Sequence, residues 1–74
     1  MAEEVRYVYG GEADGSGRCC WVQAWVGFRQ VGTFKGYTRK PEDNVITLYP
    51  YRITDPDLIK AEKKVLPLRE LHMA

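Results

Sequence analysis

The sequence has few of the residues from which small proteins build metal sites and disulfide frameworks. It contains one histidine and two cysteines in 74 residues. Because Cys19 and Cys20 are adjacent, a disulfide between them would be a strained vicinal ring, and in a strand their side chains point to opposite faces. We therefore expect neither a stapled secreted scaffold nor a zinc site, and the thiols favour a reducing cytoplasm.

Long apolar runs and an excess of one charge are also missing. The most apolar stretch, residues 19–28, is interrupted by Gln23 and is far shorter than the ~20 residues that span a bilayer. Eleven basic residues against ten acidic ones leave a net charge of +1, so no whole-molecule field steers nucleic acid or a membrane surface. The acidic start of the chain predicts no secretory signal, and no membrane association is expected.

Catalysis is not expected from so small a set of reactive groups. The single histidine, His72, lies near the C-terminus, and no Ser/His/Asp or Cys/His arrangement can be built around it. The glycine-rich segment 11–17 lacks the lysine of a phosphate-binding loop and the bidentate glutamate of a calcium loop. We therefore predict a protein that is not an enzyme and that has no cofactor and no metal site.

The residues that are present form the composition of an ordinary folded domain, with 45% apolar and 28% charged side chains. A chain of this length forms one domain, residues 1–74, that buries about 60% of its unfolded surface. Residues 67–74 are too apolar for a solvated tail and too short to be stable alone. We expect them either to form a flexible or docking tail or to pack back onto the sheet.

Four segments predict strands because they are rich in β-branched and aromatic residues between turn-forming ones. They are residues 5–9, 19–29, 30–38 and 45–49. In the second segment the alternate positions from Cys20 to Phe28 are all apolar, which predicts that they face the core. Pro50 then restricts the last strand to a sheet edge or an early end, because proline cannot donate to the ladder.

A helix of about ten residues is predicted after the last strand. Asp55 is a suitable N-cap, Pro56 suits the first helical position, and Pro67 ends the helix. Apolar residues recur between them at helical spacing, namely Leu58, Ile59, Ala61, Val65 and Leu66. The predicted fold is therefore α+β, a small antiparallel sheet of three to four strands with one C-terminal helix. An SH3-like, partly open barrel is one form that this order of elements can take.

The middle of the chain is basic and aromatic at once, which makes it the candidate binding surface. Residues 15–41 contain five basic residues and no acidic one, whereas the rest of the chain has a net charge of −4. Aromatic side chains alternate with these basic ones. The predicted partner-binding residues are Arg18, Trp21, Trp25, Arg29, Phe34, Lys35, Tyr37, Arg39 and Lys40.

Three interpretations of this surface are open. Trp21 and Trp25 can pack under the predicted helix as core, with the cations solvated. The same composition is typical of protein interfaces, where Trp, Tyr and Arg supply most of the binding energy. It is also typical of single-stranded nucleic-acid platforms, where rings stack on bases and cations follow phosphates. Because one helix covers only one face of a sheet, either a tight barrel encloses both faces or one face is left for a partner.

We therefore expect a small regulatory protein, a regulator or inhibitor that docks on a larger protein or protein complex. A phage-type transcription regulator that binds host RNA polymerase illustrates this class, although no motif in the sequence indicates it. The alternative is a nucleic-acid-binding protein that uses the same cations and rings. A monomer or weak dimer is expected, the dimer through the edge strand 45–49.

Overall fold

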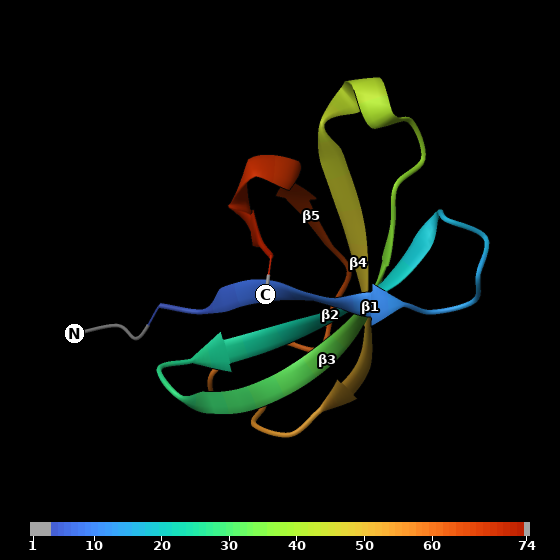
Figure 1. Ribbon diagram of the computed structural model, residues 1–74. Helices are drawn as coiled ribbons and strands as arrows, with labels where there is room; N and C mark the ends of the chain where they lie inside the picture. Colours follow the sequence, from blue (N-terminus) through green and yellow to red (C-terminus); the bar gives the residue numbers. More distant parts are fainter. Residues whose placement is uncertain (1–3, 74) are drawn as a thin grey trace.

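The computed structural model describes residues 4–73, which form a single curled sheet (Figure 1). Its strands are β1 (Arg6–Glu12), β2 (Cys19–Val26), β3 (Arg29–Tyr37), β4 (Val45–Ile53), β5 (Lys64–Pro67) and β6 (Leu71–His72). The order across the sheet is β5-β4-β3-β2-β1-β6, with antiparallel neighbours except that β6 runs parallel to β1. A 3-10 turn of three residues, η2 (Leu68–Glu70), separates β5 from β6. The two edges of the sheet therefore lie close together, and the sheet is a half-barrel.

The predicted α+β fold, with three to four strands and a C-terminal helix, is wrong. The described residues form six strands, and their only helical segments are η1 (Pro41–Asp43) and η2, both short 3-10 turns. The four predicted strands overlap β1 to β4, so the error lies after residue 53. There the chain adds two more strands instead of a helix.

The segment that was predicted to be a helix makes one turn and then extends. Asp55 does cap a turn, because its side chain accepts a hydrogen bond from the Asp57 amide (3.2 Å) and its carbonyl accepts one from the Leu58 amide (3.2 Å). The chain then continues into β5 on the edge of β4. A helix of ten residues is marginal by itself, whereas an unpaired β4 would leave its backbone groups and buried residues at an open edge.

The core lies inside the curl and is built from alternate residues of the strands. Its buried side chains are Tyr7, Val22, Ala24, Val31, Phe34, Ile46, Leu48, Ile59 and Leu66. Two glycines of β3 make this packing possible. A Cβ on Gly32 would lie 2.7 Å from Ile59 Cδ1, and a Cβ on Gly36 would lie 2.7 Å from Ile46 Cδ1. Ile59, which belongs to the β4–β5 connection that was predicted to be helical, therefore packs into the core beside Gly32.

The turn between β2 and β3 corrects a second prediction. The alternating apolar pattern from Cys20 to Phe28 ends one position early, because the chain reverses at Gly27, whose φ is +61°. Phe28 is fully exposed at this turn instead of facing the core.

Pro50 also differs from expectation, since β4 continues through it to Ile53. The pairing of β4 with β3 shifts register beside Pro50, and such a bulge tolerates proline in a strand.

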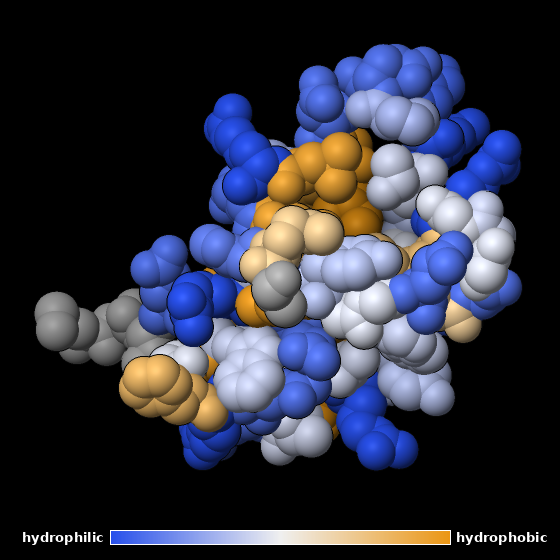
Figure 2. Space-filling model, viewed as in Figure 1, coloured by the Kyte–Doolittle hydropathy of each residue, from blue (hydrophilic) through white to orange (hydrophobic). Residues whose placement is uncertain are grey.

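The segment after β5 packs back onto the sheet. Leu71 and His72 pair with Tyr7 and Val8 of β1, and Leu68 and Leu71 pack against the core. Figure 2 shows an apolar patch between β4 and η2, where this segment approaches the sheet. Apolar contacts therefore help to hold the two edges together. Among residues 4–73 no helix has the length and apolarity that crossing a bilayer requires.

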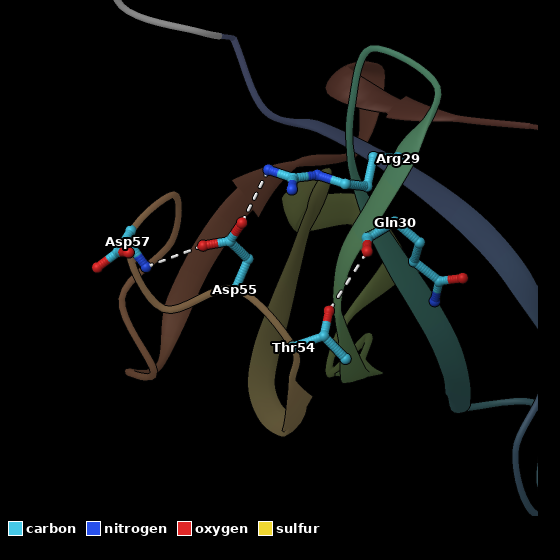
Figure 3. A network of polar contacts seen from close by, with 5 residues as sticks. All are labelled: Arg29, Gln30, Thr54, Asp55 and Asp57. Carbon is cyan, nitrogen blue, oxygen red and sulfur yellow. Dashed lines mark hydrogen bonds and ion pairs between the residues drawn. The ribbon is translucent and has the colours of Figure 1, made fainter.

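A polar network ties the start of β3 to the connection after β4 (Figure 3). Arg29 donates a hydrogen bond to the Asp55 carboxylate at 2.8 Å, which is also an ion pair. The Thr54 hydroxyl donates to the Gln30 carbonyl at 3.3 Å. The backbone amides of Thr54 and Asp55 both donate to the Val31 carbonyl at 3.1 Å. These contacts place the turn at residue 55 beside β3, so that Ile59 can reach the core.

Candidate binding groove on the outer face of the sheet

A groove of about 780 Å³ runs across the outer face of β3, β4 and β5. It lies on this face because alternate residues of a strand point to opposite sides, so that the neighbours of core residues project outward. Thr47 and Tyr49 of β4 flank the buried Leu48, and Val65 of β5 precedes the buried Leu66. The groove is lined by Arg18, Lys35, Tyr37, Thr38, Arg39, Thr47, Tyr49, Pro50, Tyr51, Lys63 and Val65.

The groove is strongly cationic. Four of its lining residues are basic and none is acidic, and they are Arg18, Lys35, Arg39 and Lys63. One carboxylate near these cations is Asp14, in the loop between β1 and β2, which interacts with Lys35. Hydrogen bonds from the backbone and side chain of Ser16 lower the pKa of Asp14, and the nearby Lys35 charge lowers it further. Asp14 thus stays ionised at neutral pH and offsets part of the charge at this margin.

The aromatic side chains of this face are packed against one another. Trp21 and Tyr51 meet edge to face with ring centroids 4.8 Å apart, and Tyr37 and Tyr49 do so at 5.6 Å. The Lys35 ammonium lies 5.5 Å from the Trp21 ring centroid, within the range of a cation–π contact. These contacts hold the rings against one another, and side chains that are already in place lose less entropy on binding.

Tyr37 stays neutral at physiological pH. The neighbouring Cys19 side chain, partial removal of the hydroxyl from water and the charge of Asp14 raise the pKa of Tyr37 above its ordinary value. Burial and the neighbouring Cys19 raise the pKa of the Cys20 thiol in the same way. The charge of the groove at neutral pH therefore comes from its lysine and arginine side chains.

Five of the nine sequence-predicted residues meet at this groove. Arg18, Lys35, Tyr37 and Arg39 line it, and Trp21 adjoins it through its contacts with Lys35 and Tyr51. They converge because β2 and β3 are neighbours in register, with Trp21 opposite Lys35.

The other four predicted residues lie elsewhere. Phe34 is in the core, with 1% of its surface exposed, and Arg29 is held by Asp55 at the opposite end of β3. Trp25 is half-buried and donates its indole N–H to Gln23 at 3.0 Å. Lys40 is exposed beside η1, outside the groove lining.

The sequence prediction missed seven groove residues, which are Thr38, Thr47, Tyr49, Pro50, Tyr51, Lys63 and Val65. Tyr49 and Tyr51 could have been found from the sequence. Together with Thr47 they occupy every second position of a strand, and this alternation places them on the face opposite the core. Lys63 carried no such signal, because it lay in the segment that was predicted to be a helix. It joins the groove only because that segment extends into β5.

Comparisons of the chain with protein families, with curated proteins and with solved structures found no match in any of the three. Within the part of the chain that the structure describes, no group of three or more His, Cys, Asp and Glu side chains is arranged to hold a metal ion. The groove, its charge and its rings are therefore the observations on which a function can be argued.

Proposed function

We propose that this protein is a non-enzymatic binding protein, a regulator or inhibitor that docks on a larger protein through the groove. The observation that carries the proposal is that four cations and three tyrosines line one groove from which acidic side chains are absent. Tyrosine and arginine are residue types that dominate protein-interface energetics, and a surface with an excess of cations selects acidic segments. The proposed partner surface is therefore acidic.

The packing of the rings favours a protein partner over single-stranded nucleic acid. Bases bind to such platforms by stacking on exposed ring faces. Here Lys35 lies over Trp21, and the pairs Trp21–Tyr51 and Tyr37–Tyr49 meet edge to face, so the tyrosine rings are partly exposed but do not form a row of parallel faces. A protein segment needs apolar contact and charge pairing from this surface, which ring edges, phenol hydroxyls and cations supply.

The proposal also includes the compartment in which the protein acts and an example of the larger protein on which it docks. Cys19 and Cys20 are free thiols, which persist in a reducing compartment, so we place the function in the cytoplasm. A transcription regulator acting on RNA polymerase, of the phage type, remains one example of such a machine. The charge of the groove indicates an acidic partner surface and does not identify the partner.

The test is an affinity capture from cell lysate, with and without nuclease, using a groove variant and a charge-matched control. Lys35→Glu with Arg39→Glu reverses two groove cations, whereas Arg6→Glu with Lys40→Glu makes the same charge change at exposed positions outside the groove lining. We expect one stoichiometric protein that survives nuclease, is retained by the control and is lost with the groove variant.

Other results would contradict the proposal. Proteins captured equally by the groove variant would place docking elsewhere. Recovery of nucleic acid, with proteins lost after nuclease, would favour the nucleic-acid alternative. In that case binding of a single-stranded oligonucleotide by four cations should weaken with salt with a log–log slope of about −3.

A further inference from the structure

We propose that the acidic partner docks as an added β-strand along the free edge of β5, with its acidic side chains beside the groove. This inference rests on the proposed function and names how the partner is held. In this mode main-chain hydrogen bonds supply affinity and alternate side chains supply specificity.

The edge of β5 is available for such pairing. β5 is the last strand of the sheet on its side, and among residues 4–73 no other strand pairs with its outer edge. The backbone groups on this edge have no strand partner, so they are the ones that an added strand can pair with.

The pairing with β4 determines which backbone groups of β5 point outward. The Leu68 amide donates to the Asn44 carbonyl at 2.8 Å, which identifies this opposed pair as a hydrogen-bonded one. Hydrogen-bonded pairs alternate along an antiparallel ladder, so Leu66 opposite Ile46 and Lys64 opposite Leu48 are also bonded. The N–H and C=O of Val65 between them therefore face away from β4.

The free edge and the groove are continuous. Val65 and Lys63 both line the groove, and the Val65 side chain is 58% exposed. The intervening Lys64 turns to the other side, where its ammonium donates to the Tyr7 hydroxyl at 3.1 Å. A strand added beside Val65 would thus project every second side chain next to Lys63 and into reach of the groove cations.

Charge decides which strand the edge accepts. Lys63 lies on the groove side of this edge, where the lining has no acidic residue, whereas the opposite side has Lys60 and Lys64 beside Glu4, Glu62 and Glu70. Two copies of this edge would bring their lysines together, and short length, lysine and proline are features that keep natural edges from self-pairing. An acidic strand instead gains cross-strand ion pairs. The occupant is therefore an extended acidic segment of the partner rather than a second copy.

The first test measures the amide of Val65 directly. The probe is a capped octapeptide that alternates glutamate with valine, and the readout is hydrogen exchange by NMR on the full chain. We expect the Val65 amide to exchange quickly in the free protein and to be protected about tenfold or more when the peptide is bound. The Leu66 amide, bonded to β4, serves as the internal control and should be protected in both states.

The second test removes donors from the peptide one at a time. N-methylation at residues that face β5 should weaken binding about tenfold or more, whereas methylation at the alternating residues should leave it within about twofold. A peptide with glutamine in place of glutamate should bind weakly, and Lys63→Glu should weaken the original peptide. An effect of N-methylation that alternates from one peptide residue to the next is specific to strand addition.

The possible failures separate the two proposals. Peptide binding that leaves Val65 unprotected and shows no alternation overturns strand addition but leaves groove docking standing. Peptide binding that Lys35→Glu with Arg39→Glu does not weaken overturns groove docking. Failure of the peptide to bind at millimolar concentration, while a single-stranded oligonucleotide binds, overturns both.

Discussion

Replacing Phe34 by alanine is expected to cost stability rather than binding alone. The sequence placed this ring among the partner-binding residues, whereas in the structure it is 1% exposed. Its ring packs edge to face on Tyr7 with centroids 5.9 Å apart. The substitution therefore tests whether β3 presents Phe34 to the core or to the surface.

The expected magnitude follows from the complete burial of the ring. Truncating a buried phenylalanine to alanine costs about 3–5 kcal/mol, from lost transfer energy and the cavity left behind. A chain of this length has a total stability of about 4–11 kcal/mol. Since each kcal/mol shifts the melting temperature of so small a domain by about 4–8 °C, we expect Tm to fall by at least about 12 °C.

The assay is thermal and urea unfolding followed by circular dichroism, with Phe28→Ala as the matched control. Phe28 undergoes the same chemical change but is fully exposed at the β2–β3 turn, so its stability should change by about 0.5 kcal/mol or less. Equal, small losses for both variants would refute the assignment of Phe34 to the core.

Two further substitutions test the packing and the limits of the site. Gly36→Ala should cost about 1–3 kcal/mol in urea unfolding, because its Cβ would lie 2.7 Å from Ile46 Cδ1. An unchanged midpoint would mean that β3 and β4 do not approach as described. Arg29→Ala should cost no more than about 1 kcal/mol, since its ion pair with Asp55 is largely exposed on the arginine side. It should also leave partner capture intact, and loss of capture would place Arg29 in the interface.

The groove shows why composition located the candidate surface only in part. Basic and aromatic residues in 15–41 pointed to β2 and β3, and period-2 alternation placed Trp21 and Trp25 on one face. Whether a residue is on that face depends on register, and the bulges between β2 and β3 and between β3 and β4 alter register in ways that spacing does not reveal. Phe34 was therefore assigned to the surface although its ring is buried.

The sequence by itself determined the strands β1 to β4, because runs of β-branched and aromatic residues between turn residues have a local preference for the β-strand conformation. It also determined the turn capped by Asp55, which is a contact between near neighbours. Only the tertiary structure decided the fate of residues 58–72. Their apolar spacing suited a helix, but the open edges of β4 and β1 offered backbone partners distant in sequence. Pairing with those edges satisfies groups that a short, marginal helix would have left open, and so β5 and β6 extend the curled sheet at its two edges.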